Sequence, residues 1–466
     1  MFKYLNKLLL LNENRALEYQ SYEITFKKIF LKIICLFIPS KSLRKKIRNL
    51  EIKSTLSELK KKYQFNKIYK ERSNKNIPLK IVFLVHLPSS WDVFASIYDE
   101  CVKDDMIIPY IVSIPRAQAG QYADFRYNEE NYNFFKEKGI EVIKGYDEIN
   151  NAYFDLKNLS PDAVFVQTPY DDQRSNIYEI KNLNKFSKVC YLQYAFIITS
   201  GDFEPKFYNT AFHENCWLLF AETDYHKNLY KKYNGSWIEN KVVVSGYPKF
   251  DCYLRDLNPS ISIWNLDKNI NPNSQRVIWC PHWTINDVFD SSNFLQYYKF
   301  FLNLAQHNLD IDLVIRPHPL LLDELICRKH LSRDELDSYI YDIEKLPNAK
   351  IDNRQDYFDL FRTSDLLISD NSSFLAEYLP TKKPIIYTHH YKNNSVNLND
   401  YGINLTKYHY IATNITELNG LINRVLLNRD DYNKEKRIKN MEEQMPFLHN
   451  HSGFFIKEHL KKSFKL

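Results

Sequence analysis

The chain has 466 residues, of which 44% are hydrophobic and 26% charged, a composition typical of a folded globular protein rather than a disordered one. This length predicts two domains plus an appendage rather than a single core. Only 9 glycines are present and no glycine-rich nucleotide loop occurs, so any phosphate site must be built from other groups. The formal net charge is +6, and its distribution along the chain is uneven.

Residues 1–76 are predicted to form a helical, basic segment that associates with a membrane. Within 24–50, apolar residues share one helical face: Phe26, Ile29, Phe30, Ile33 and Phe37. Basic residues lie on the other face or follow it: Lys27, Lys28, Lys32, Lys41, Arg44, Lys45, Lys46 and Arg48. The pattern fits an anionic membrane surface, and a helix packed on the protein with a solvated basic side stays open as the alternative.

The apolar run at 33–38 is too short to cross a bilayer, and no small-residue cleavage site follows it. We therefore expect a cytoplasmic protein that is peripheral on the inner face of the cell membrane. Nucleic acid is not an expected partner, because no stacking motif or DNA-binding pattern accompanies the basic residues.

From residue 79 onward, strand-like apolar runs alternate with segments long enough for crossover helices. The runs lie at 79–87, 107–114, 140–145, 162–169, 188–198, 216–223 and 241–251. A polar stretch at 256–275 interrupts the pattern, which resumes at 276–283, 311–319, 349–353, 365–373 and 383–390. The alternation predicts an α/β fold of two Rossmann-like domains, 77–255 and 256–440, followed by a tail or helix at 441–466. A cleft between the two domains is the expected binding site.

Ligands gather beyond the carboxyl ends of parallel strands, so polar residues that directly follow apolar runs are site candidates. In the second half, His282 follows one run, and Arg316 and His318 follow another. Pro317 and Pro319 stiffen that loop. Arginine offers a fork of donors to phosphate, and histidine donates to phosphate or moves a proton near neutral pH. One such histidine is more often structural, but two histidines and an arginine at strand ends of the same half favour a site.

The segment "DNSSFLAE" at 370–377 ends a predicted strand and starts a helix. A helix cap explains Ser372 or Ser373 but not both, whereas exposed amides beside two hydroxyls form a seat for an anion. Asp370 would repel a phosphate at close range, so we expect it to orient a loop or contact a hydroxyl. Together with Arg316 and His318, the segment predicts a diphosphate site.

Three strand ends of the first half supply further candidates. We expect the acceptor side to include His86, Ser90 and Gln193, with Ser89, Asp92, Tyr194 and Asp202 nearby. The turn "GYPKFD" adds Gly246, Lys249 and Asp251. A Gly-Tyr-Pro turn is common in loops, so a purely structural reason explains this pattern about as well as a functional one. His449 and His451 are interpreted as part of a loop or tail.

The seven cysteines show no C-x-x-C or His spacing suited to zinc, and no His/Asp/Glu pattern suggests a bound metal. An odd, unpatterned set is typical of reduced thiols in the cytosol. We expect neither a metal nor a cofactor.

These segments together resemble the CDP-glycerol glycerophosphotransferase family, the poly(glycerol phosphate) and poly(ribitol phosphate) polymerases and primases of wall teichoic acid and related capsules. "SGYPKFD" resembles the family's Gly-x-Pro-Arg-x-Asp turn, with Lys249 in place of the arginine, and "VIWCPHW" resembles its Ala-Pro-Thr-Trp strand end, with His282 in place of the threonine. "VIRPHP" is similar to its Arg-x-His segment, which makes His318 the counterpart of an essential histidine. "LLISDNSSFLAEYLPTKKPIIY" resembles its Asp-Tyr-Ser-Ser element, with Glu377 at the acidic position.

The resemblance implies a GT-B architecture, with 77–255 as the acceptor domain and 256–440 as the nucleotide-donor domain. It implies that the serine pair lies against the donor diphosphate. On the donor side we place Ser372, Ser373, Asp370, Asn371, Glu377, Gly246 and Lys249, with His318, His282 and Arg316 as the catalytic candidates.

One segment departs from the family pattern. The family's first domain has a His-Gly-Thr-Pro segment whose histidine is the expected general base, but the comparable stretch here reads "LQYAFIITSGDF" and contains no histidine. Either the base lies elsewhere, with His86 and His282 as candidates, or the acceptor and the transferred group differ.

The sequence thus predicts a transferase that moves glycerol or ribitol phosphate from a CDP-linked donor to a lipid-linked or capsular glycan. A GT-B glycosyltransferase using a nucleotide-sugar is the main alternative, because it needs the same diphosphate seat. A nucleotide-sugar 2-epimerase and a non-catalytic glycan-binding scaffold are weaker alternatives.

Overall fold

The computed structural model describes residues 75–117, 125–126, 129–201, 204–256, 264, 273–285, 292–354, 356–370, 372–389, 397–449 and 451–465. The chain divides into two units, residues 1–77 with 460–466, and residues 78–459. The basic segment predicted at 1–76 lies almost entirely outside the described residues. The account below concerns the second unit.

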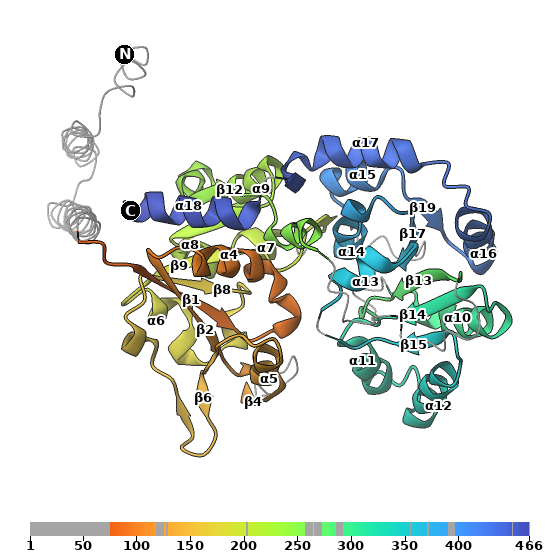
Figure 1. Ribbon diagram of the computed structural model, residues 1–466, viewed down its shortest axis with the longest axis horizontal. Coiled ribbons are helices and arrows are strands. Elements are labelled where there is room, and N and C mark those ends of the chain that lie inside the picture. Colours follow the sequence, from red (N-terminus) through yellow and green to blue (C-terminus); the bar gives the residue numbers. More distant parts are fainter. Residues whose placement is uncertain are drawn as a thin grey trace, which may run out of the picture. The chain divides into compact units, whose positions relative to one another are not determined.

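The first half of this unit is built on a seven-stranded parallel sheet with the order β12-β11-β9-β8-β1-β2-β5 (Figure 1). Its strands are β1 (Leu79–Val85), β2 (Ile107–Ser113), β5 (Ile143–Lys144), β8 (Ala163–Val166), β9 (Lys188–Leu192), β11 (Leu218–Ala221) and β12 (Val242–Val244). The longer helices of this half are α4 (Asp92–Val102), α5 (Glu129–Glu137) and α9 (Asp224–Asn234). Continuous apolar runs such as "IVFLV" form these strands because strands covered on both faces have no solvent side.

The second half is built on a six-stranded parallel sheet with the order β15-β14-β13-β16-β17-β19. Its strands are β13 (Gln275–Cys280), β14 (Ile311–Ile315), β15 (Ala349–Ile351), β16 (Leu366–Ser369), β17 (Ile385–Thr388) and β19 (Tyr410–Ala412). Its helices are α10 (Phe294–His307), α11 (Leu321–Cys327), α12 (Arg333–Glu344), α13 (Phe358–Thr363), α14 (Ser372–Glu377), α15 (Asp400–Thr406), α16 (Ile415–Leu421) and α17 (Lys434–Gln444). Two parallel sheets are what the alternating pattern of the sequence predicts.

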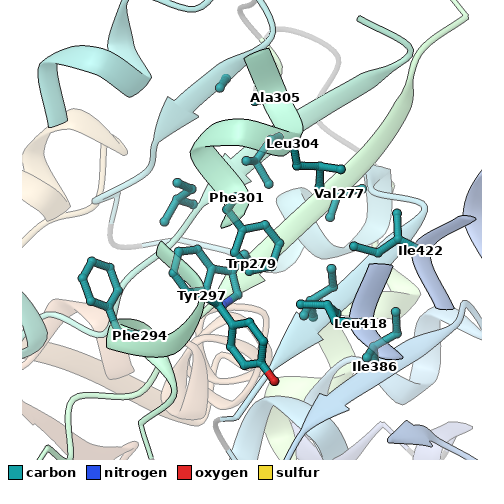
Figure 2. Packing of buried hydrophobic residues seen from close by; sticks show 14 of the residues in the cluster. Val277, Trp279, Phe294, Tyr297, Phe301, Leu304, Ala305, Ile386, Leu418 and Ile422 are labelled. Atoms are coloured by element: carbon teal, nitrogen blue, oxygen red, sulfur yellow. The ribbon is translucent and has the colours of Figure 1, made fainter. Parts of the chain in front are cut away.

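The core of the second half forms where α10, α12 and α16 cover one face of the sheet. Figure 2 shows Trp279 of β13 among aromatic side chains of α10. Its ring stacks on Phe301 with the ring centroids 4.2 Å apart and on Phe294 at 5.5 Å. Such pairs add roughly 1 kcal/mol each beyond their buried area, so they hold α10 and the strand end it follows in place.

The chain returns to the first half after α17. Helix α18 (Ser452–Phe464) begins where Asp251 accepts the main-chain N–H groups of Ser452 and Gly453, at 3.0 and 2.8 Å. A Cβ on Gly453 would lie 2.5 Å from Ser96 of α4, so the helix start approaches α4 closely. Asp251 therefore has a structural role in anchoring this helix.

Gly246, which the sequence placed in a turn, meets the same returning segment. Its φ is +76°, and a Cβ there would lie 2.5 Å from Ser452 Oγ and 3.1 Å from Phe447 Cδ2. Both the backbone conformation and the lack of space require glycine at this position.

We expect Gly246→Ala to lower the free energy of unfolding by about 2–4 kcal/mol, because it combines a left-handed backbone with a steric overlap. Urea denaturation followed by circular dichroism measures this change. Gly420→Ala is the matched control, since a Cβ at this exposed position of α16 meets nothing within 4 Å. It is expected to be neutral or stabilising by up to about 1 kcal/mol. Equal effects of the two substitutions would contradict the steric argument.

Candidate functional site

Four neighbouring strands of the second sheet end at the same edge. The register pairs Trp279 with both Ile315 and Ile368, and Ile315 with Ile351. The ladder continues one residue further, because Arg316 N donates to Trp279 O and Asp352 N donates to Ile315 O, each at 2.8 Å. The segments that carry His282, Arg316, His318, Asp352 and Asp370 therefore start side by side along this edge.

Asp370 joins two separate segments of chain. Its Oδ1 accepts the main-chain N–H of His282, and its Oδ2 accepts that of Asn293, both at 2.6 Å. Burial raises the pKa of this carboxyl to about 7, against the opposing effect of the two N–H donors. Asp370 thus orients loops, which is one of the two roles that the sequence predicted for it.

His282 and His318 lie next to each other with their ring centroids 5.2 Å apart. His318 Nδ1 accepts the N–H of Leu320 at 3.2 Å, so in the neutral ring Nε2 carries the proton and is the donor. Burial lowers the pKa of His282 to about 4, which leaves this imidazole uncharged at neutral pH. Its Nδ1 lies 2.8 Å from Thr284 Oγ1. In the neutral state each ring of the pair carries one N–H group: on His318 it is at Nε2, and on His282 the tautomer decides which nitrogen carries it.

Arg316 is buried and already has protein partners. Its NH1 donates to Asp352 Oδ2 at 2.6 Å, its NH2 donates to the carbonyl of Arg354 at 2.7 Å, and its guanidinium lies over the ring of Tyr357. Burial opposes ionisation of Asp352, but the hydrogen bond from Arg354 and the charge of Arg316 lower the pKa of Asp352 below its usual value. The sequence analysis identified Arg316 but neither Asp352, which lies within the strand-like run at 349–353 and directly follows β15, nor Arg354, which directly follows the run.

Lys249 and Glu377 form a buried ion pair between the two halves, with Lys249 Nζ 3.6 Å from Glu377 Oε1. Tyr357 donates its hydroxyl to Glu377 Oε2, and Tyr247 donates to Oε1 at 3.4 Å. Lys249 Nζ also donates to Tyr357 Oη at 3.1 Å. Lys249 and Glu377, two of the residues predicted for the donor side, thus contact each other and share two tyrosine partners. The sequence analysis did not single out these tyrosines for this role.

The segment between Asp370 and Glu377 is only partly described. Helix α14 begins at Ser372, where the sequence predicted a helix start. Asn371 and the side chain of Ser372 lie outside the described residues, and Ser373 is half-buried. The seat for an anion predicted here stays a prediction.

The acceptor-side candidates lie at the ends of β1 and β9 and in the loop after β1. Gln167, which follows β8, accepts the N–H groups of His86 and Leu87 through its Oε1, both at 3.0 Å. His86 Nε2 lies 3.3 Å from Thr168 Oγ1. Tyr191 donates its hydroxyl to Gln193 Oε1. His86, Ser90 and Gln193 are all buried.

The sequence analysis did not identify Gln167 and Thr168, because they fall inside the strand-like run at 162–169, whereas in the structure β8 ends at Val166 and both residues follow it. Asp202 lies outside the described residues, as does the side chain of His449. No group of three or more His, Cys, Asp or Glu suited to a metal ion occurs in the part of the chain that the structure describes. Within the same ranges, no helix has the length and apolarity needed to cross a membrane.

Comparison with known sequences gives the chain relatives. A sequence model of the family described as CDP-glycerol:poly(glycerophosphate) glycerophosphotransferase matches residues 204–447. The teichoic acid poly(glycerol phosphate) polymerase of Bacillus subtilis (strain 168) is 25% identical over 150 residues, which are 32% of this chain and 18% of the relative. The teichoic acid glycerol-phosphate transferase of Staphylococcus aureus (strain NCTC 8325 / PS 47) is 25% identical over 152 residues, or 32% of this chain and 35% of the relative. The matches thus span well under two thirds of either relative.

Solved structures share the fold at low identity. The wall teichoic acid polymerase TagF has a TM-score of 0.56 and 16% identity, over 91% of this chain and 97% of that one. UDP-GlcNAc 2-epimerase from Neisseria meningitidis has a TM-score of 0.56 and 14% identity, over 82% of this chain and all of that one (100%). At these identities the likeness concerns the fold alone, and it confirms the predicted GT-B-like class for the described part of the chain.

Titration of Asp370 makes a pH-dependent contribution to stability. Its pKa is about 7 in the folded protein and near 3.8 when solvated, so the folded state holds the proton more tightly. We expect wild-type stability relative to Asp370→Asn to fall by about 1.4 kcal/mol per pH unit between about pH 4 and 7, and to level off above. Urea denaturation of both proteins at several pH values measures the difference. A difference that does not vary with pH would contradict burial as the dominant influence.

The ion pair of Lys249 and Glu377 is expected to be strongly coupled. Lys249→Ala leaves a buried carboxylate without its cation and should lower the free energy of unfolding by about 3–5 kcal/mol. In a double-mutant cycle, the double variant Lys249→Met/Glu377→Gln should be less destabilised than the sum of the effects of Lys249→Met and Glu377→Gln, by at least about 1 kcal/mol. The exposed pair of Lys231 and Glu239, at 2.9 Å, is the control cycle and should show a coupling below about 1 kcal/mol. Similar couplings in the two cycles would argue against burial as the cause.

Proposed function

We propose that the chain transfers an alditol phosphate from a CDP-linked donor. The chain belongs to the CDP-glycerol:poly(glycerophosphate) glycerophosphotransferase family, the family that its sequence motifs predicted. Glycerol phosphate or ribitol phosphate is the proposed group, and a lipid-linked or capsular glycan is the proposed acceptor. The observation that supports this most directly is the placement of His282 and His318 side by side at the carboxyl edge of the second sheet, within the region that the family model matches.

In the proposed reaction, a hydroxyl of the acceptor attacks the phosphorus atom that carries the alditol. A bond forms between the acceptor oxygen and this phosphorus, the phosphoanhydride bond breaks, and CMP leaves. His318 Nε2–H donates to a phosphoryl oxygen as negative charge develops, because Nδ1 is occupied as an acceptor. Positioning and neutralisation of charge account for most of the acceleration in reactions of this class.

The serines at the start of α14 are the proposed contact for the diphosphate, with Asn371 beside them. Asp370 supports this seat indirectly, since it ties the loop of His282 to the start of α10. Glu377 and Lys249 are proposed to line the donor side as a pair, with a donor hydroxyl reaching the carboxylate. Gly246 shapes the turn that presents Lys249.

The proton of the acceptor hydroxyl needs a base. His282 is uncharged at neutral pH, but its lowered pKa makes it a weak proton acceptor. His86 is the second candidate, placed at the carboxyl edge of the first sheet and held there by Gln167. The basic segment at 24–50 is proposed to hold the enzyme on an anionic membrane surface beside a lipid-linked acceptor.

One observation supports a second candidate function. The stretch "LQYAFIITSGDF" contains no histidine where the family has its expected base, which is compatible with transfer of a sugar from a nucleotide-sugar to the same kind of acceptor. Both reactions would use the same diphosphate seat, so identification of the donor decides between them.

The test is a donor screen on the purified full chain with CDP-glycerol, CDP-ribitol and common UDP-, GDP- and CMP-sugars. We expect binding of a CDP-alditol by calorimetry and release of CMP measured by chromatography. His318→Ala should lower turnover by about 100-fold or more, and Ser372→Ala/Ser373→Ala should weaken binding of the donor. His307→Ala, on the exposed end of α10, is the control and should leave both unchanged. Preference for a nucleotide-sugar would overturn alditol-phosphate transfer and favour the glycosyltransferase.

A further inference from the structure

Asp352 joins two arginines that differ in exposure. Its Oδ2 accepts from NH1 of Arg316 at 2.6 Å, and its Oδ1 accepts from Nε of Arg354 at 2.5 Å. Arg316 and Asp352 are buried, whereas the side chain of Arg354 is 39% exposed. One buried carboxylate therefore serves two guanidinium groups.

The three residues carry one more positive than negative charge. Three other acids lie close by: Asp356 is paired with Lys138 at 3.4 Å, Asp359 is paired with Arg362 at 3.5 Å, and Glu344 accepts the main-chain N–H of Ile351 at 2.8 Å. Burial, and next the charge of Arg354, lowers the pKa of the neighbouring Lys350, against the opposing charges of Asp352 and Glu344. A bound anion would offset this excess at the edge of the sheet.

Arg354 is held by both its backbone and its side chain. Its carbonyl accepts from NH2 of Arg316 at 2.7 Å, and its Nε is fixed on Asp352. Among the described residues, no acceptor is found for its two terminal nitrogens. These nitrogens are thus preset at an exposed position beyond the ends of β14 and β15, and a guanidinium binds phosphate oxygens through paired donors.

We propose that Arg354 binds the diphosphate of the donor, and that Arg316 is a positioning residue that holds Asp352 and, through it, Arg354. Arg316 is poorly placed to bind phosphate, because its NH1 already donates to Asp352 and its NH2 to the carbonyl of Arg354. Identification of the anion as the donor diphosphate rests on the proposed function, whereas the anion site itself rests on the three residues alone.

The experiment titrates pyrophosphate, CDP and CMP into the full chain by calorimetry. In Arg354→Ala we expect the Kd for pyrophosphate and for CDP to rise about 10-fold or more, and the Kd for CMP to rise much less. Arg354→Lys should recover only part of the affinity, because lysine keeps the charge but not the fork. Arg328→Ala is the matched control: Arg328 Nε donates to Glu324 at 2.6 Å and its side chain is 43% exposed, but among the described residues no second arginine pairs with Glu324.

Asp352→Asn separates positioning from charge. It removes a negative charge, so a purely electrostatic site should bind pyrophosphate more tightly, whereas the proposed positioning role predicts weaker binding. Thermal melts check that each variant is folded. Arg354→Ala is the variant least expected to impair folding, because the side chain of Arg354 is partly exposed to solvent.

Unchanged pyrophosphate and CDP affinity in Arg354→Ala, or no pyrophosphate binding by the wild type, would overturn the proposal and leave the three residues as a structural ion-pair group. Failure of the proposed function has a different signature. In that case the wild type binds pyrophosphate through Arg354 but neither binds nor turns over a CDP-alditol. Turnover of a CDP-alditol with unaltered KM in Arg354→Ala would sink this inference while the proposed function stands.

Discussion

Asp370 accepts main-chain N–H groups from His282 and Asn293, and this buried carboxylate is the contact on which the candidate site depends. It connects the loop that leaves β13 with the start of α10, whose aromatic side chains cover Trp279 of the same strand. An unsatisfied buried N–H costs about 1–3 kcal/mol, so neither loop can move away from the carboxylate without a penalty of this size. The position of His282, and of His318 beside it, follows from that constraint.

Two other buried acids near this edge also connect separate segments of the chain. Asp352 follows β15 and holds Arg316, and Glu377 at the end of α14 holds Lys249 and two tyrosines. Buried carboxylates are retained where their partners are complete, because an unpaired buried charge is far more costly than an apolar side chain. Each of these three acids binds donors on a different segment of the chain, so the edge of the sheet is held in place by polar contacts as well as by apolar packing.

The sequence predicted the strands well, because strands covered on both faces read as continuous apolar runs. It also singled out polar residues near the strand ends, among them Asp370, which the structure shows to accept main-chain N–H groups of two loops. It did not predict Asp352 and Arg354 as partners of Arg316, because that contact depends on β15 lying next to β14, and strand order is not readable from local patterns. Tyr357 and Tyr247 were missed for a related reason: an aromatic residue near a strand end is most often part of a core, and their contacts with Glu377 depend on where the fold places that carboxylate.

Arg316 and Arg354 differ in their partners because they differ in burial. An arginine directly after a strand, as Arg316 is, emerges where the sheet is still covered, so it needs a protein carboxylate to be tolerated there. Three residues after the end of the neighbouring strand, Arg354 has reached solvent while its backbone is still bound to Arg316. The sequence signal that points to the first basic residue after a strand therefore finds Arg316, which supports the edge, whereas the arginine that reaches solvent, Arg354, lies further along the neighbouring loop.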